Sequence, residues 1–141
     1  MPSATKLSVL VAEDETLLRM MATDMFEQAG FKVIEASTGE AAVKLLKATP
    51  VAALFTDVEL LGPMDGFQLA WIVHERDPDA AILVVSGRQF PKPEDLPPGA
   101  IFISKPYDLK RVRQSLEQLI NVREIGHAAG DSVKTKPAAT T

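Results

Sequence analysis

The chain has 141 residues, which is enough for one domain with its own core and too few for two ordinary domains. Its 46% hydrophobic and 24% charged residues are typical of a globular protein, and its net charge of −4 argues against nucleic acid as the main partner. The absence of cysteine excludes disulfides and thiol chemistry. The longest apolar runs, of about six residues, are too short to cross a membrane. We therefore expect a cytoplasmic protein without a secretory signal.

Strand-like and helix-like segments alternate from the start of the chain. Residues 7–12 (LSVLVA) form an apolar run that predicts a buried strand. A helix is then predicted from Glu15 to Ala29, with Gly30 as its C-terminal stop, followed by a short strand over 31–36. The apolar positions with helical spacing in the first helix are Leu18, Met21, Ala22, Met25 and Ala29.

The second helix is predicted from a capping signal. Ser37 and Glu40 have the spacing of a capping box, and the buried face would carry Ala42, Leu45 and Leu46.

A third strand, over 51–56, is followed by a long loop and another helix. The loop contains a turn signal at Gly62-Pro63, and the helix is predicted to start near Asp65-Gly66 and to stop before Pro78.

Residues 87–99 (GRQFPKPEDLPPG), between the strands predicted at 80–86 and 100–104, cannot form a regular helix. Four prolines and two glycines stand within this segment, and each interior proline costs a helix about 3 kcal/mol. We predict an irregular connection with at most one turn, in which Pro93 comes first and Glu94 and Asp95 follow. The segment is either a simple structural replacement for a helix or a surface reshaped for a partner.

The last helix is predicted to start after Asp108, a good N-cap residue. Beyond residue 120 the residues are mostly small or polar and show no helical or strand periodicity. We therefore expect a short tail over 1–6, one domain over 7–122 and a disordered tail over 123–141. The apolar face of this helix would consist of Leu109, Val112, Leu116, Leu119 and Ile120.

Strands that alternate with helices predict an α/β fold with a parallel sheet covered on both faces. Because the carboxyl ends of parallel strands meet at one edge, the polar residues that end the strands should gather there. Those residues are Glu13, Asp14, Asp57, Ser86 and Lys105.

The grouped residues have the chemistry of a metal site beside a phosphoryl pocket. Carboxylates crowded together need a cation, and hard oxygen ligands in small number suit Mg²⁺, with Mn²⁺ possible. Asp57 would then act as a nucleophile that forms an acyl phosphate, while Lys105 and the hydroxyl of Ser86 balance the phosphoryl charge. Each residue taken alone has an ordinary alternative as a helix cap or a turn residue.

This set resembles the receiver domain of two-component response regulators, of the stand-alone type, over about residues 7–122. The resemblance rests on the acidic pair Glu13-Asp14, the Thr56-Asp57 pair, the "MDG" at 64–66, Ser86 and Lys105-Pro106. It implies a flavodoxin-like fold with strand order 2-1-3-4-5.

The same resemblance implies a role for each site residue. Asp57 would be the phosphoacceptor, and Asp14, Asp57 and the backbone carbonyl of Glu59 would bind Mg²⁺, with Glu13 acting through metal-bound water. Ser86 and Lys105 would sense the phosphoryl group, and the Lys105-Pro106 peptide would be cis.

Two features depart from the usual family pattern. The loop between Asp57 and "MDG" is one residue longer than is common, and the aromatic switch position holds Phe102, which has no hydroxyl. Phe102 is either a switch that changes rotamer, together with Ser86, or a core residue. Because the family's fourth helix is largely missing here, the dimer geometry usual in the family is not expected for this chain.

The predicted function is a signalling switch without an output domain of its own and without classical enzyme activity. A sensor histidine kinase or a histidine phosphotransfer protein would phosphorylate Asp57, and the product would dock on an unknown downstream protein or pass the phosphoryl group on. Three alternatives remain open: a phosphatase with Glu59 as general acid, a histidine phosphodonor at His74, and a degenerate receiver that binds partners without phosphorylation.

Overall fold

The computed structural model describes residues 6–129, which form an α/β fold. The strands are β1 (Ser8–Ala12), β2 (Lys32–Ala36), β3 (Ala53–Asp57), β4 (Ala81–Ser86) and β5 (Ile101–Ser104). The helices are α1 (Thr16–Gln28), α2 (Gly39–Ala48), α3 (Gly66–Arg76) and α4 (Leu109–Ala129), with one 3₁₀ turn, η1 (Pro93–Asp95).

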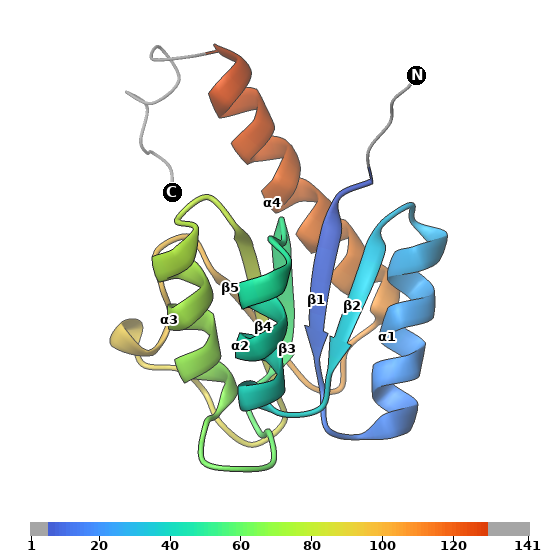
Figure 1. The fold of residues 1–141 in the computed structure, drawn as a ribbon, viewed down its shortest axis with the longest axis vertical. Helices are drawn as coiled ribbons and strands as arrows, with labels where there is room; N and C mark the ends of the chain where they lie inside the picture. Colours follow the sequence, from blue (N-terminus) through green and yellow to red (C-terminus); the bar gives the residue numbers. More distant parts are fainter. Residues whose placement is uncertain (1–5, 130–141) are drawn as a thin grey trace.

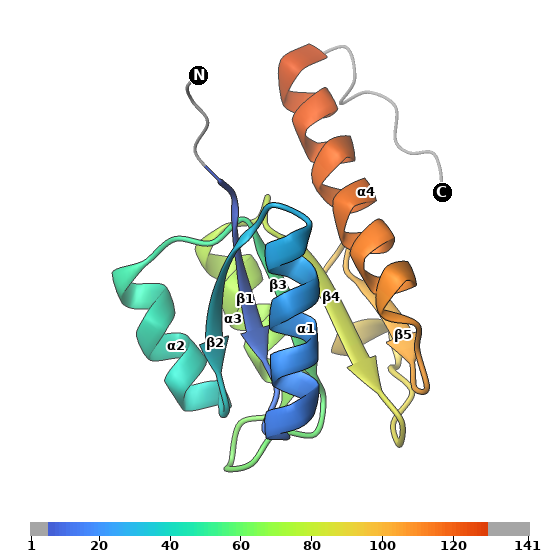
Figure 2. The ribbon, with the colours of Figure 1, turned by 90° about the vertical axis from the view of Figure 1, so that its right-hand side faces the viewer.

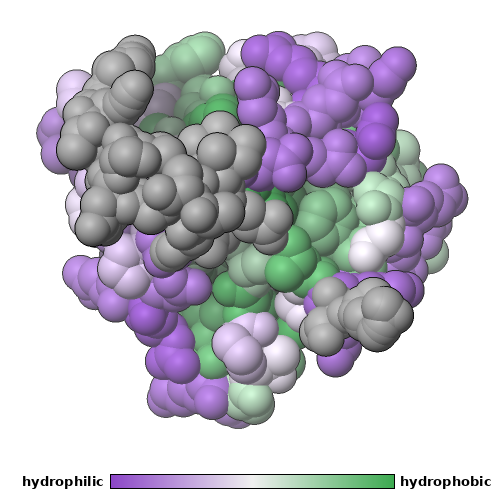
Figure 3. All heavy atoms as spheres, turned by 90° about the horizontal axis from the view of Figure 1, so that it is seen from above, coloured by the Kyte–Doolittle hydropathy of each residue, from purple (hydrophilic) through white to green (hydrophobic). Residues whose placement is uncertain are grey.

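The strands form one five-stranded parallel sheet in the order β2-β1-β3-β4-β5, as predicted. Two views at right angles show α1 and α4 over one face of the sheet and α2 and α3 over the other (Figures 1 and 2). All strands point the same way, so their carboxyl ends lie together at the lower end of the molecule in Figure 1. The opposite end, seen in Figure 3, shows mainly hydrophilic side chains around a few hydrophobic ones.

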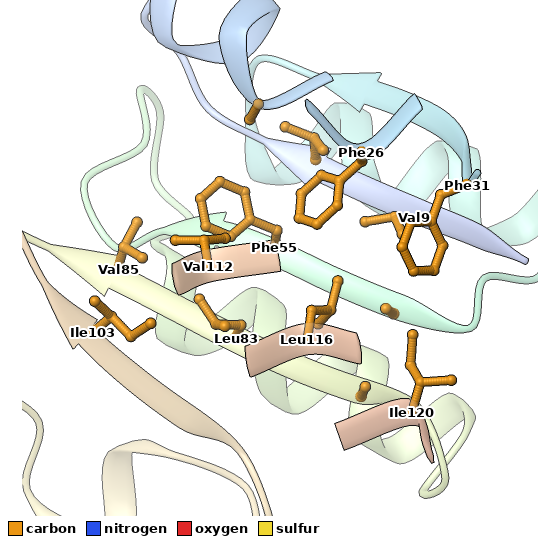
Figure 4. Close-up of a cluster of buried hydrophobic side chains, with 14 residues drawn as sticks. Val9, Phe26, Phe31, Phe55, Leu83, Val85, Ile103, Val112, Leu116 and Ile120 are labelled. Carbon is orange, nitrogen blue, oxygen red and sulfur yellow. The ribbon is translucent and has the colours of Figure 1, made fainter. Parts of the chain in front are cut away.

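Both faces of the sheet are buried because helices cover them, and successive residues of each strand point into one core or the other. Val9 and Phe55 lie in the core beneath α1 and α4, whereas their neighbours Leu10 and Leu54 lie in the core beneath α2 and α3. In the first core Phe26 packs edge-to-face against Phe55, with ring centroids 5.7 Å apart (Figure 4). Val112, Leu116 and Ile120 of α4 close this core from above the sheet, as Figure 4 shows.

The prediction for the inward face of α1 was wrong at Met21 and left out Phe26. Met21 is 45% exposed, and the side chains buried in the helix are Ala22, Thr23 and Phe26. Met21 faces a groove beside Lys105 instead of the sheet.

The predicted cap of α2 was also wrong by one residue. Thr38, and not Ser37, is the N-cap: its backbone is extended and its hydroxyl accepts a hydrogen bond of 3.0 Å from the N–H of Ala41. Glu40 stands at the second helical position, so a capping box with Ser37 does not form. The predicted inward face is confirmed, with Ala42 and Leu46 buried and Leu45 partly buried against the same core.

The starts of the last two helices agree with the sequence. Asp65 caps α3 in a capping box with Gln68, and the side chain of Asp108 accepts from the N–H of Lys110 at the start of α4. However, α4 continues to Ala129, past the domain boundary predicted at residue 122. The rest of the predicted tail, 130–141, and most of the predicted tail over 1–6 lie outside the described residues.

The proline-rich connection is as predicted, with a single 3₁₀ turn that begins at Pro93. The turn is closed by Asp95, whose side chain accepts from the N–H of Lys92 at 2.8 Å. No α-helix lies in the described segment between β4 and β5, so η1 is the one helical turn in this connection.

Candidate functional site

Asp57 is the last residue of the central strand β3 and is 3% exposed. One carboxylate oxygen, Oδ2, lies 2.5 Å from Nζ of Lys105, and the other, Oδ1, accepts from the backbone N–H of Glu59 at 3.1 Å. Asp57 and Lys105 stand 48 residues apart in the chain. The parallel sheet brings them together, as the sequence predicted.

Lys105 follows the last residue of β5, and the Lys105-Pro106 peptide is cis, which confirms the prediction. Partial burial of the ammonium group acts to lower the pKa of Lys105. The hydrogen bond and charge of Asp57, with help from Glu13, outweigh this effect, so that the pKa is raised. The lysine therefore stays charged and pairs with the side chain of Asp57.

Glu13 and Asp14 differ in their environment although they are adjacent. Glu13 is only 2% exposed, and its Oε2 accepts from the N–H of Glu15 at 3.0 Å, whereas Asp14 is partly exposed. Burial is the main cause that raises the pKa of Glu13 to about 7, and the nearby charge of Asp57 acts in the same direction. Acidic groups are thus crowded at this edge of the sheet.

Ser86, the last residue of β4, is 1% exposed and points toward the neighbouring loop. Its hydroxyl donates to Oε2 of Glu59 at 2.6 Å and accepts from the backbone N–H groups of Arg88 and Gln89 at 3.1 and 3.0 Å. The side-chain amide of Gln89 donates to the same Glu59 oxygen at 3.2 Å. Sequence reasoning considered Glu59 for its carbonyl or as a general acid, and it missed this contact, for which the sequence has no signal.

Gly66 explains why the "MDG" motif ends in glycine. A Cβ atom at this position would lie 2.1 Å from the backbone carbonyl oxygen of Asp57, which is a severe clash. The N–H of Gly66 donates to the carbonyl of Val58 at 2.9 Å, so the start of α3 is packed directly on the site strand.

A family model described as "Response regulator receiver domain" matches residues 9–117. The chain belongs to this family. The matched range includes nearly all of β1, the other four strands and the first part of α4, and it places the chain among proteins of two-component signalling.

Two individual relatives cover most of the receiver domain. The chain is 30% identical over 115 residues to the response regulator receiver protein CpdR of Brucella abortus, and the match covers 79% of this chain and 95% of that protein. The structure of a response regulator receiver protein from Sinorhizobium medicae has a TM-score of 0.81 and 29% identity, covering 86% of this chain and 99% of the other. By contrast, the match to an NtrX-like response regulator of Rickettsia felis spans 18% of that longer protein.

A third comparison concerns a receiver attached to a kinase. The receiver domain from the hybrid histidine kinase CckA matches with a TM-score of 0.68 and 26% identity, covering 80% of this chain and 98% of that domain. This likeness supports the family and the fold.

The oxygen donors at the carboxyl end of the sheet fit a divalent cation. They do not form a site of three carboxylate side chains. Among residues 6–129, no three or more histidine, cysteine or acidic side chains gather closely enough to hold a metal ion. A site made of two carboxylates and one backbone carbonyl needs only two acidic side chains, and Asp14, Asp57 and Glu59 would supply these donors. All three are the hard oxygen donors that Mg²⁺ prefers. The nearby charge of Asp57, which together with burial raises the pKa of Glu13, gives a reason for a cation there.

Phe102 on β5 is partly buried against the core beneath α2 and α3. Its ring also contacts Phe90 of the proline-rich segment, with centroids 6.2 Å apart, and Phe90 is 75% exposed. Phe102 thus joins the core to the surface segment that replaces the fourth helix.

In the part of the chain that the structure describes, no helix has the length and hydrophobicity to span a bilayer.

Proposed function

We propose that this receiver domain is a phosphorylation switch in which Asp57 accepts a phosphoryl group. The observation that carries the proposal is the contact of 2.5 Å between Lys105 Nζ and Asp57 Oδ2 at the carboxyl end of the sheet. A buried aspartate paired with one lysine has both a nucleophilic oxygen and a cation for the incoming charge.

Phosphorylation forms a bond between an Asp57 oxygen and phosphorus as the bond from phosphorus to the donor breaks. Lys105 then exchanges its contact with Asp57 for one with a phosphoryl oxygen, since its flexible stem lets the ammonium follow the charge. Water later attacks phosphorus, the bond to Asp57 breaks, and inorganic phosphate leaves with the carboxylate restored.

We assign the metal ligands to Asp14, Asp57 and the carbonyl of Glu59, with Glu13 acting through metal-bound water. A bound Mg²⁺ would neutralise charge on the transferring group. The division is supported by burial, because Glu13 is buried and its Oε2 already accepts from the N–H of Glu15, whereas Asp14 is partly exposed.

Acetyl phosphate with Mg²⁺, followed by intact mass spectrometry, tests the proposal. We expect a gain of about 80 Da, one phosphoryl group, in the wild type and none in Asp57→Asn. Asp24→Asn, which removes an exposed carboxylate on α1, is the matched control and should be phosphorylated normally. Phosphorylation of Asp57→Asn to the same extent as wild type would reject Asp57 as the acceptor.

The physiological donor is proposed to be a phosphohistidine on a sensor kinase or phosphotransfer protein. Leu17 and Met20 are exposed on α1, and Met21 lines an apolar groove that Lys105 also lines, so a partner docked there would reach the site. Met20→Glu should slow transfer from an autophosphorylated histidine kinase that phosphorylates the wild type, while the reaction with acetyl phosphate is unchanged. Equal rates of transfer from the kinase would argue against this docking face.

The other candidate functions have less support. A phosphatase would need Glu59 as a free general acid, but its carboxylate is hydrogen-bonded to Ser86 and Gln89. His74 lies on α3 with its ring against Trp71, centroids 5.7 Å apart, and not in a long helical hairpin. Sustained turnover of phosphomonoesters would favour the phosphatase, and partner binding without any mass gain would favour the degenerate receiver.

A further inference from the structure

The hydroxyl of Ser86 has no unused hydrogen-bonding capacity in this structure. A serine hydroxyl has one proton to donate and two lone pairs that accept. The proton goes to Glu59 Oε2 at 2.6 Å, and the lone pairs accept the N–H groups of Arg88 and Gln89. Ser86 can therefore donate to a phosphoryl group only if it first gives up Glu59.

Glu59 joins the loop after β3 to the segment after β4. Its Oε2 receives the hydroxyl of Ser86 and the side-chain amide of Gln89, which lie 27 and 30 residues further along the chain. A hydrogen bond from a hydroxyl to a carboxylate is of the strong, charge-assisted kind. The residue after Gln89, Phe90, packs against Phe102. A series of contacts therefore joins Glu59 in the site to the exposed 87–99 segment.

We propose that the carboxylate of Glu59 occupies, at Ser86, the role that a phosphoryl oxygen takes after phosphorylation. Glu59 is thus a positioning residue that holds Ser86 and the start of the 87–99 segment in the resting arrangement. The inference rests on the proposed function, because it supposes that a phosphoryl group on Asp57 competes for the Ser86 hydroxyl.

This competition sets how readily the domain switches. A phosphoryl group must displace an acceptor that is already in place, so part of its interaction with Ser86 is offset by the loss of the Glu59 contact. When Ser86 leaves, Gln89 loses its neighbour on Glu59, and the segment that carries Phe90 is free to rearrange.

The binding of beryllofluoride, a mimic of the phosphoryl group on aspartate, with Mg²⁺ measures the competition. Glu59→Ala should bind beryllofluoride about tenfold more tightly than the wild type, as expected for release of one charged hydrogen bond. Glu59→Gln should lie between the two, because its amide oxygen still accepts a hydrogen bond but carries no charge.

A double-mutant cycle separates this role from simple repulsion between Glu59 and the anion. If Glu59 acts by holding Ser86, its substitution has no effect on beryllofluoride affinity in a Ser86→Ala background. If Glu59 only repels the anion, Glu59→Ala gives the same gain with and without Ser86. That result, or equal affinity of wild type and Glu59→Ala, would overturn the inference.

The resting contact is tested separately in the unphosphorylated protein. In ¹H–¹⁵N NMR spectra, Glu59→Ala should shift the backbone amides of Arg88 and Gln89, and prior removal of the Ser86 hydroxyl should reduce this shift. Unshifted amides would overturn the inference even if the wild type is phosphorylated. A wild type that shows the amide shifts but takes up neither beryllofluoride nor acetyl phosphate would instead refute the proposed function.

Discussion

At the scale of single residues, Gly66 has the strictest steric requirement in the site. Its place is filled by the backbone of β3, with the carbonyl oxygen of Asp57 2.1 Å from where a Cβ would stand. Backbone cannot move aside as a side chain can, so any larger residue must displace β3 or the start of α3.

Gly66→Ala is therefore expected to lower the free energy of unfolding by about 1–3 kcal/mol, the usual range for overpacking. Urea denaturation measures the loss, and phosphorylation by acetyl phosphate should slow because Asp57 shifts. Gly39→Ala is the comparison: its Cβ would lie 2.7–2.9 Å from Sδ, Cγ and Cβ of Met64, and a side chain yields more readily than the backbone of β3, so we expect a smaller loss. Equal losses for the two variants would contradict the steric explanation.

The buried hydroxyl of Thr23 on α1 lowers the stability of the fold, and a substitution can remove it. It is 7% exposed, and its hydroxyl is buried without a hydrogen-bond partner in the described structure. Thr23→Val replaces the hydroxyl with a methyl group of similar shape, so we expect stabilisation by about 1 kcal/mol. Thermal unfolding checks this, and Thr23→Ser, which keeps the hydroxyl and loses the methyl group, should destabilise. A less stable Thr23→Val would mean that the hydroxyl has a partner.

The site residues themselves were predictable to different degrees. Asp57 and Lys105 could be found because each ends an apolar run, and topology then forces them together. The partner of Ser86 could not be found, because the direction of the Glu59 side chain depends on the path of the loop over residues 58–65 between β3 and α3. Only the folded loop decides that it reaches Ser86 and Gln89.

At the scale of elements, the start of α2 shows how local chemistry selects between neighbours. Ser37 and Thr38 are both good caps, but the hydroxyl of Thr38 is the one that accepts from a free N–H of the first turn. An isolated bridge between Thr38 and Leu61 places the backbone at this point, and this long-range contact is not visible in the sequence.

Thr38→Ala should cost about 1 kcal/mol of stability, the usual loss for a helix cap. Ser37→Ala, one residue earlier and exposed, should change stability by only a few tenths of a kcal/mol. Chemical denaturation of both variants measures the difference. The reverse order would restore the capping box first predicted at Ser37.

The connection between β4 and β5 was the element most clearly determined by composition. Proline lacks an N–H and cannot sit inside a helix, so the segment had to be irregular, and Pro93 begins its one turn. The side chains that this segment contacts were not predictable, because the Phe90–Phe102 pair joins residues of different elements.

At the scale of the whole molecule, the fold brings acidic groups to one edge where they repel one another. Burial and the nearby charge of Asp57 both raise the pKa of Glu13, even though Asp57 is paired with Lys105. A divalent cation bound at this edge should therefore stabilise the native state over the unfolded chain.

We expect Mg²⁺ to raise the free energy of unfolding by about 3 kcal/mol at a hundredfold excess over its Kd, and EDTA to reverse this. Asp14→Asn should lose most of the gain, whereas Asp24→Asn should keep it. Urea unfolding with and without Mg²⁺ measures the effect. Equal stabilisation of all variants would exclude Asp14 as a ligand.

The sequence by itself determined the class of the fold, the strands and the residues that end them, because burial on both faces of a parallel sheet requires continuous apolar runs. It also determined the irregular segment before β5, since proline excludes a helix. The tertiary structure decided which side chains meet: Thr38 with Ala41, Phe26 with Phe55, and Glu59 with Ser86. Such contacts depend on loop paths and on the rotation of each helix against the sheet, which are set by packing across the whole core.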